Sequence, residues 1–467
     1  MTSLEDRNIC LVVVDSLTAF NLKEYGYERE TAPFLSKVAE EGVFCKFAYS
    51  NAPWTFPSHA SMFSGKLPVD HEATSATMSF EDESFVEELS ERGYHTHSYS
   101  VNSLIAPKLG ITKGFDEAFV ENEVFFENEM PGNYEAWKKI HEESYDSELD
   151  RYMDFAKSAL KKGEFRSMEF GLKQLLDDTG LINHQYFENH GADELNELAS
   201  WKFDQDVISD KFFLFMNYME VHGYGAPREL VEDWIDYDEA REVLEDLDLI
   251  PELSEEKKDL LVGLYDGQIR YTDIRLKKLV ENVREEHPDT VFIFTSDHGQ
   301  NSGHYGVRNH QYGVWERLIR VPLVIWGEGI PDLEIEENVA LRDLHDLILG
   351  KTEVEDLGKE KVFAEYYGAK NFTVKFGGRD IERYPGDKRH LLENTSKAVV
   401  KRRKGYIRNS HIDDFVFEAG MDGFSEESLD PEDHQDLRQE IEERFGDHKG
   451  SSDDVERSKD EEVKDKL

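Results

Sequence analysis

The chain has 467 residues, of which 39% are apolar and 12% aromatic, and this composition excludes a chain that is disordered as a whole. The length is enough to bury a large core in one big domain or two. With 54 basic and 100 acidic residues, the formal net charge is −46, which disfavours nucleic-acid binding because such a surface repels polyanions.

Short apolar segments alternate with amphipathic ones along most of the chain. We predict buried strands at 9–14, 94–101, 211–219, 291–295 and 323–326, and helices at 32–41, 85–92 and 257–285. This alternation is typical of an α/β fold, in which helices connect parallel strands and cover both faces of the sheet. The sequence therefore predicts a central, mostly parallel sheet in a main domain over residues 1–360.

One long segment breaks this alternation. Residues 122–208 are acidic, rich in Phe, Tyr and Trp, and helical in pattern, with no clear strand. We interpret them as a helical insertion that could wall or cover a site.

The pattern changes again beyond residue 360. Strand-like runs at 362–367, 372–376 and 398–407 are separated by glycine and charged residues, which predicts a small C-terminal antiparallel α+β subdomain over 361–448. Residues 449–467 are almost wholly polar and charged, which predicts an acidic disordered tail.

Composition and the N-terminus also bear on where the protein works. Charged residues make up 33% of the chain, against about 25% in an ordinary soluble protein. Such an acidic excess indicates a halophilic protein, because molar salt screens charges over about 3 Å and removes their self-repulsion. No apolar run approaches the about 20 residues of a membrane-spanning helix, and no secretory signal is visible, so we expect a cytoplasmic location without a membrane span.

Polar residues follow two of the predicted strands directly. Asp15 directly follows the strand at 9–14, and Asp297-His298-Gly299 follows the strand at 291–295. Sites in open α/β sheets lie outside the carboxyl ends of the strands, where Asp and His can present oxygen and nitrogen to one cation. The alternatives are a helix cap or turn former at Asp15 and a solvated turn at 297–299.

A third segment supplies a hydroxyl. Pro57 and Ser58 can open a short helix that Gly65 ends, which places Thr55 just ahead of a helix N-terminus, where an ionised hydroxyl is favoured. A free threonine is a poor nucleophile, but coordination to a divalent cation lowers the pKa of its hydroxyl. The alternative is that Thr55 merely caps the helix.

Two of the histidines near these motifs are candidates for the site. Glu220-Val-His222 ends the strand at 211–219, so Glu220 and His222 would point the same way if the chain stays extended. His310 lies on the loop after Asp297. Each imidazole could bind a second metal, protonate a leaving group or hold a substrate anion, so one metal and two are both open.

The ordered set of motifs resembles the sulfatase branch of the alkaline phosphatase superfamily, from about residue 8 to about residue 410. The matching motifs are Tyr25-Gly26-Tyr27, Thr31-Ala-Pro33, the segment from Pro53 to Gly65, Glu220-Val-His222, Asp297-His298-Gly299, and Trp315-Glu316 leading to Ile319-Arg320-Val321-Pro322. This resemblance implies an alkaline-phosphatase-like catalytic domain. It also implies that a divalent ion is bound by Asp15, Thr55, Asp297 and His298.

The departures from the family pattern concern the nucleophile. Sulfatases use a Cys or Ser that is oxidised to formylglycine within Cys/Ser-x-Pro-x-Arg, whereas this chain reads Thr55-x-Pro57-x-His59. Threonine cannot form that aldehyde, because its β-carbon carries a methyl group. A directly attacking threonine is what phosphomonoesterases and phosphodiesterases of the same superfamily employ. Ser16 also replaces a frequent second Asp, and Gln311 stands where many sulfatases have a Lys.

These observations predict a metal-dependent hydrolase of small-molecule or glycan sulfate or phosphate esters, with phosphate mono- or diesters favoured. Thr55 would be the nucleophile, and His59, His222 and His310 would complete the catalytic set. Mixed oxygen and nitrogen ligands suit calcium, magnesium, manganese or zinc, and nitrogen favours the last two. The alternatives are a phosphoglycerol- or phosphoethanolamine-type transferase and a non-catalytic anion-binding protein. Nothing in the sequence indicates an oligomeric state.

Overall fold

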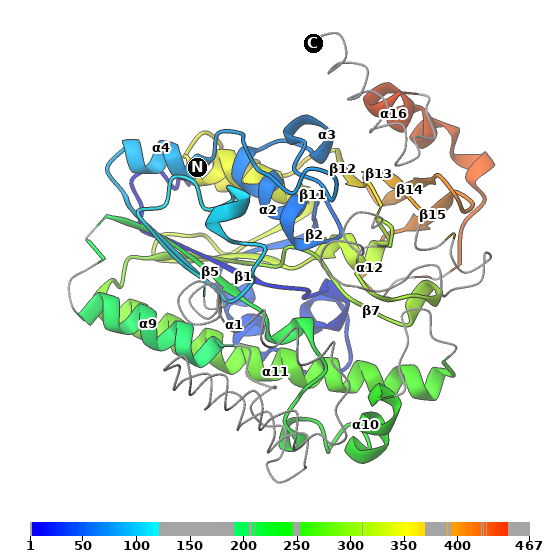
Figure 1. Cartoon of the computed structure of the whole chain (residues 1–467), viewed down its shortest axis with the longest axis horizontal. Coiled ribbons are helices and arrows are strands. Elements are labelled where there is room, and N and C mark those ends of the chain that lie inside the picture. The colour runs from blue at the N-terminus through cyan, green and yellow to red at the C-terminus, as the bar shows by residue number, and fades with distance from the viewer. Residues whose placement is uncertain are drawn as a thin grey trace, which may run out of the picture.

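The computed structural model describes residues 2–120, 191–204, 208–209, 211–245, 253–310, 312–368, 390, 394–421, 423, 425 and 427–446. Within these residues a nine-stranded, mostly parallel sheet runs through the molecule, with helices on both faces (Figure 1). A smaller antiparallel sheet lies beside it. The predicted α/β architecture is therefore confirmed.

The central sheet places β1 (Ile9–Val14) between β6 (Val291–Thr295) and β5 (Phe212–Tyr218), parallel to both. The strand order is β11-β2-β10-β6-β1-β5-β3-β4, with β9 paired to β2. The remaining strands are β2 Val43–Tyr49, β3 His95–Ser100, β4 Glu117–Val120, β9 Arg320–Val321, β10 Leu323–Gly327 and β11 Leu333–Ala340. All residues of β1, β5 and β6 are buried, because both faces of the sheet are covered.

Two helical layers enclose the sheet (Figure 1). One contains α1 Pro33–Glu41, α9 Ala192–Asp204, α10 Tyr237–Glu245 and α11 Glu255–Glu286, and the other contains α2 Thr55–Ser64, α3 Pro68–His71, α4 Phe85–Glu91 and α13 Leu344–Ile348. Strand β5 serves both layers: Phe213 and Phe215 enter the core beneath α2 and α4, while Leu214 and Met216 enter the core beneath α9 and α11. This alternation follows from the period of two in a strand.

The smaller sheet has the antiparallel order β12-β13-β14-β15, with α16 (Gln435–Phe445) packed against β13 and β14. Its strands are β12 Lys361–Tyr366, β13 Ser396–Lys401, β14 Lys404–Asn409 and β15 Phe415–Glu418. The predicted single strand at 398–407 is wrong: it is a hairpin that turns at Arg402, whose φ is 57°. The strand predicted at 372–376 and the tail at 449–467 lie outside the described residues.

Several strands were not predicted from the sequence. In the central sheet they are β2, β4, β9 and β11, and in the smaller sheet β15; β4 and β11 are the two ends of the central sheet, and β11 mixes acidic with apolar residues. Most of the predicted insertion at 122–208 lies outside the described residues, and α9 is its described helix. Among the helices that the structure describes, none combines the length and apolar character needed to cross a bilayer.

Candidate active site

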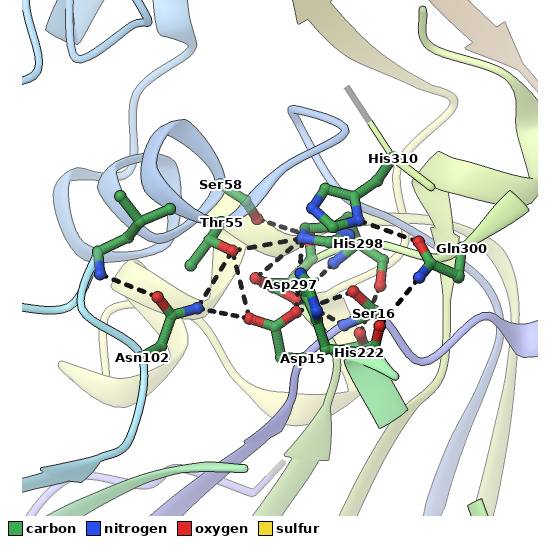
Figure 2. A network of polar contacts seen from close by, with 12 residues as sticks. Asp15, Ser16, Thr55, Ser58, Asn102, His222, Asp297, His298, Gln300 and His310 are labelled. Atoms are coloured by element: carbon green, nitrogen blue, oxygen red, sulfur yellow. Dashed lines mark hydrogen bonds and ion pairs between the residues drawn. The ribbon is translucent and has the colours of Figure 1, made fainter. Parts of the chain in front are cut away.

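The site forms where the carboxyl ends of neighbouring parallel strands meet the start of α2 (Figure 2). Asp15 follows β1, and Asp297 and His298 follow β6, which pairs with β1. Thr55 is the first residue of α2. The structure thus brings together the four residues that the resemblance to sulfatases implied as metal ligands.

The distances within this group are short. One ligand atom from each of Asp15, Asp297 and His298 lies within 4.8 Å of the others, and all three residues are buried. His298 Nε2 is 3.3 Å from Asp297 Oδ2 and 3.8 Å from Asp15 Oδ1. Thr55 Oγ1 is 3.2 Å from Asp15 Oδ2 and 3.4 Å from His298 Nε2.

The hydrogen bonds leave ligand atoms free for a cation. Asp297 Oδ1 accepts from the backbone N–H groups of Ser16 and His298, at 3.2 and 2.9 Å. Asp297 Oδ2 is buried without a hydrogen-bond partner in the described part of the chain. His298 Nδ1 donates to the Gly299 carbonyl oxygen at 2.9 Å, which leaves the lone pair on Nε2. An unpaired buried carboxylate oxygen beside an imidazole lone pair fits a divalent cation.

The charges of the site also favour a bound divalent cation. Burial and repulsion from the Asp15 carboxylate raise the pKa of Asp297 well above its ordinary value. Burial also opposes ionisation of Asp15, but the imidazoles of His298 and His222 hold its pKa below the ordinary value. Burial lowers the pKa of His298 to about 4. Two buried carboxylates this close oppose each other's ionisation, and a divalent cation would allow both to ionise.

Ser16 connects the two carboxylates. Its backbone is left-handed, with φ of 67°, which is uncommon for a residue other than glycine. Its hydroxyl donates to Asp15 Oδ1 at 2.8 Å, and the Tyr265 hydroxyl donates to its carbonyl oxygen at 2.6 Å. These bonds, with the one from its N–H to Asp297, hold the strained conformation.

Thr55 occupies a helix start, but not the one predicted. The helix begins at Thr55 itself, after the extended Trp54, rather than at Pro57, and it ends at the left-handed Gly65 as expected. Thr55 is therefore not the residue that caps α2. Its hydroxyl instead donates to Asp15.

Asn102 is a site residue that the sequence analysis missed. Its amide nitrogen donates to Asp15 Oδ2 at 2.7 Å and lies 3.4 Å from Thr55 Oγ1. Its amide oxygen accepts from the Leu104 N–H at 2.9 Å, which fixes the orientation of the amide. Asn102 lies just beyond β3, so the strand-end rule that located Asp15 and Asp297 could have found it.

His59 lies behind Thr55, one helical turn along α2. Its Nδ1 donates to the Thr55 carbonyl oxygen at 2.8 Å and is 3.8 Å from Asp297 Oδ2. The ring packs edge-on against Phe63 and Phe215, and burial lowers its pKa to about 4. His59 is therefore a neutral, buried imidazole at neutral pH.

His222 and His310 lie together, but the predicted direction of Glu220 is wrong. The segment Glu220–His222 forms a 3-10 turn rather than continuing the extended chain. Glu220 accepts from the Ala192 N–H at the start of α9 (2.8 Å), while the His222 ring is 4.9 Å from that of His310. The His310 ring is in turn 4.2 Å from that of His298. Gln311 lies outside the described residues.

Comparison with known proteins now settles the family. A family model described as Sulfatase matches residues 7–352. The chain belongs to the sulfatase family. An arylsulfatase from Clostridium perfringens is 22% identical over 355 residues, which are 69% of each chain.

Solved structures show the same fold as this sulfatase-family chain. A phosphonate monoester hydrolase of Agrobacterium radiobacter superimposes with a TM-score of 0.60, at 14% identity, over 94% of each chain. A 2-O GAG sulfatase superimposes with a TM-score of 0.57, at 13% identity, over 97% of this chain and 94% of the other. The protein is thus a sulfatase-family hydrolase with the alkaline-phosphatase-like fold.

The sulfatase motif is altered at two positions that α2 brings together. Cys/Ser-x-Pro-x-Arg reads Thr55-x-Pro57-x-His59, and the two altered residues are four apart, one helical turn from each other. The larger, permanently charged Arg is replaced by an imidazole that bonds to the Thr55 carbonyl oxygen. The two altered positions of the motif therefore belong to one local arrangement.

Proposed function

We propose that this protein hydrolyses phosphate esters, with diesters foremost, through a covalent intermediate on Thr55. The observation that carries this proposal is the place of Thr55 Oγ1, within 3.2 Å of Asp15 Oδ2 and 3.4 Å of His298 Nε2 at the start of a helix. Asp15, Thr55, Asp297 and His298 would hold a divalent cation. When bound, it supplies positive charge that favours the ionised hydroxyl and neutralises the ester oxygens.

The side chains of this site prepare the hydroxyl for attack. Its hydrogen points to Asp15 Oδ2, the acceptor to which the proton leaves, and Asn102 holds that same oxygen. The β-methyl of Thr55 restricts the rotation of the side chain, so Oγ1 stays directed at this group. Oγ1 then forms a bond to phosphorus as the bond from phosphorus to the leaving oxygen breaks, and the leaving oxygen takes up the proton that passed to Asp15.

The type of nucleophile favours phosphorus over sulfur. Thr55 cannot become the formylglycine on which family sulfatases rely, because of its β-methyl group. The labelled side chains of the site are carboxylates, hydroxyls, imidazoles and amides, and none of these groups carries a permanent positive charge (Figure 2). A diester carries one negative charge, which suits such a site better than the two charges of a phosphate monoester.

The experiment compares ester classes and variants at Thr55. We expect the parent protein, in molar salt with each of calcium, magnesium, manganese and zinc, to cleave bis(nitrophenyl) phosphate faster than nitrophenyl phosphate or nitrophenyl sulfate. Thr55→Ala should lose turnover but keep its metal, and Thr55→Ser should keep part of the activity because it retains Oγ. A Thr55→Ala variant as active as the parent would overturn the proposal, as would a clear preference for sulfate esters.

A further inference from the structure

Gln300 and His310 lie at the open end of a short hairpin beside the site (Figure 2). The hairpin consists of β7 (Asn301–Ser302) and β8 (Arg308–Asn309), in which Asn301 is paired with Asn309. This pairing places the residue before β7 next to the residue after β8. Gln300 is 1% exposed and His310 5% exposed, so their mutual contact is shielded from water.

The orientation of the Gln300 amide follows from the partners that it has. One end lies 3.2 Å from the backbone carbonyl oxygen of His222, which can only accept, so this end is the amino group. The other end is therefore the amide oxygen, 3.0 Å from Nδ1 of His310. Arg317 Nε donates to the Gln300 carbonyl oxygen at 3.1 Å and holds the backbone in place.

This orientation assigns the hydrogen on the His310 ring. An amide oxygen can only accept, so Nδ1 of His310 carries the hydrogen, and the neutral ring has its lone pair on Nε2. Such a ring can accept a hydrogen bond at Nε2 but cannot donate one there to a phosphoryl oxygen. Among the roles open to a histidine here, this tautomer is therefore least suited to holding the substrate anion.

The His310 ring lies beside the proposed ligand His298. Its centroid is 4.2 Å from that of His298 and 4.9 Å from that of His222, on the side of the site away from Asn102 (Figure 2). Release of a covalent adduct from Thr55 needs a water molecule that loses a proton as it attacks phosphorus. Of the buried imidazoles near Thr55, His298 is a proposed ligand of the cation, and His59 lies inside α2 and packs against Phe63 and Phe215.

We propose that Gln300 is a positioning residue for this second step: it holds His310 in the Nδ1–H tautomer, so that Nε2 accepts the proton of the attacking water. The inference rests on the proposed function, because it requires the phosphothreonine intermediate. In this step the water oxygen forms a bond to phosphorus as the bond from phosphorus to Thr55 Oγ1 breaks. The water proton passes to His310 Nε2, and Oγ1 regains a proton when His310 releases it.

Two substitutions of Gln300 separate positioning from packing. Gln300→Met has a similar length but cannot accept from His310, whereas Gln300→Glu keeps an acceptor for Nδ1–H. With bis(nitrophenyl) phosphate, Gln300→Met should give a normal first burst of nitrophenol and then a turnover slower by about a hundredfold. Mass spectrometry should show the phosphoryl adduct accumulating on Thr55. Gln300→Glu should largely restore turnover and prevent this accumulation.

The tautomer can also be observed directly in the parent protein. In protein labelled with ¹⁵N-histidine, the signal that His310→Gln removes should have the pattern of the Nδ1–H tautomer in the parent and in Gln300→Glu. An Nε2–H tautomer in the parent overturns the inference even if the Met variant does not fold. So does a Gln300→Met variant with parental turnover, or a Glu variant as slow as the Met variant. A parent that turns over without any Thr55 adduct overturns the proposed function and, with it, this inference.

Discussion

Asn102 donates a hydrogen bond of 2.7 Å to Asp15 Oδ2, the same oxygen that accepts from the Thr55 hydroxyl at 3.2 Å. One carboxylate oxygen therefore links a residue beyond β3 to the proposed nucleophile. Because the Leu104 N–H fixes the other end of the Asn102 amide, the amide cannot rotate away without losing a bond.

This relationship predicts that Asn102→Ala lowers kcat by about 10- to 100-fold, since outer partners of metal ligands have effects of that size. Thr55 and the proposed ligands remain in the variant, so metal content should fall much less than activity. The neighbouring Ser103→Ala, on an exposed residue, is the matched control and should behave as the parent. Steady-state kinetics and metal analysis of both variants check this. Parental kinetics in Asn102→Ala would show that the amide has no part in orienting Asp15 and Thr55.

The unpaired Oδ2 of Asp297 predicts that substitution of this residue affects stability differently with and without a bound metal ion. In protein stripped by a chelator, Asp297→Asn should be as stable as the parent or more stable, because it removes a buried carboxylate whose pKa is raised by burial and by Asp15. With metal added at about 100 times its Kd, the parent alone should gain about 2.7 kcal/mol. Thermal unfolding with and without the ion measures both effects.

Asp273→Asn is the control for that experiment. The Asp273 carboxylate accepts from the backbone N–H groups of Phe34 and Leu35, at 2.8 and 2.9 Å, at the start of α1. Loss of the Asp273 carboxylate should lower the free energy of unfolding by the same amount whether or not metal is present. If metal stabilised Asp297→Asn as much as the parent, Asp297 would not be a ligand.

The net charge of −46 predicts that salt stabilises the protein. Raising salt from about 0.1 M to about 1 M shortens the screening length from about 10 Å to about 3 Å, which weakens repulsion between surface carboxylates. The Tm should therefore rise steadily over this range in metal-loaded protein. Sorbitol at matched osmolarity is the control and should raise Tm less than salt does. A Tm that does not change with salt would count against the halophilic interpretation.

The strands and polar residues at the centre of the site were predicted from the sequence, whereas Asn102 was not. Strands β1 and β6 were predicted at their observed bounds, because they are continuous apolar runs, and the polar residues that follow them located Asp15, Asp297 and His298. Strand β3 reads His-Thr-His-Ser-Tyr-Ser, a polar pattern that is nonetheless almost wholly buried. This strand was predicted at 94–101, but because its own residues are mostly polar, the polar residue beyond it, Asn102, did not stand out.

Other contacts of the site depend on partners distant in sequence. The turn at Glu220–His222 is accompanied by the bond from Ala192 to Glu220, which no local pattern indicates. The bond between Gln300 and His310 depends on a hairpin of two-residue strands, too short to show a period. Local periodicity therefore predicts the strands that carry the proposed ligands, whereas the residues that orient them emerge only from tertiary contacts.

Glu220 gives a prediction about pH. It is fully buried, its Oε2 has no hydrogen-bond partner within the described residues, and burial raises its pKa from 4.5 to about 7. The folded state therefore binds this proton more tightly than the unfolded state. The stabilisation that the protonated Glu220 provides is fully present below pH 4.5 and is lost as the pH rises through about 7.

Glu220→Gln should remove this dependence while keeping an acceptor for the Ala192 N–H. A shift of this size corresponds to about 3 kcal/mol, at about 1.4 kcal/mol per pKa unit. Urea unfolding in molar salt, with parent and variant compared at both ends of the range from pH 4.5 to about 7, isolates the contribution of this one group. The variant should gain stability relative to the parent as the pH rises. A difference between the two proteins that stays constant with pH would mean that Glu220 is already ionised in the folded protein, with a compensating charge at α9.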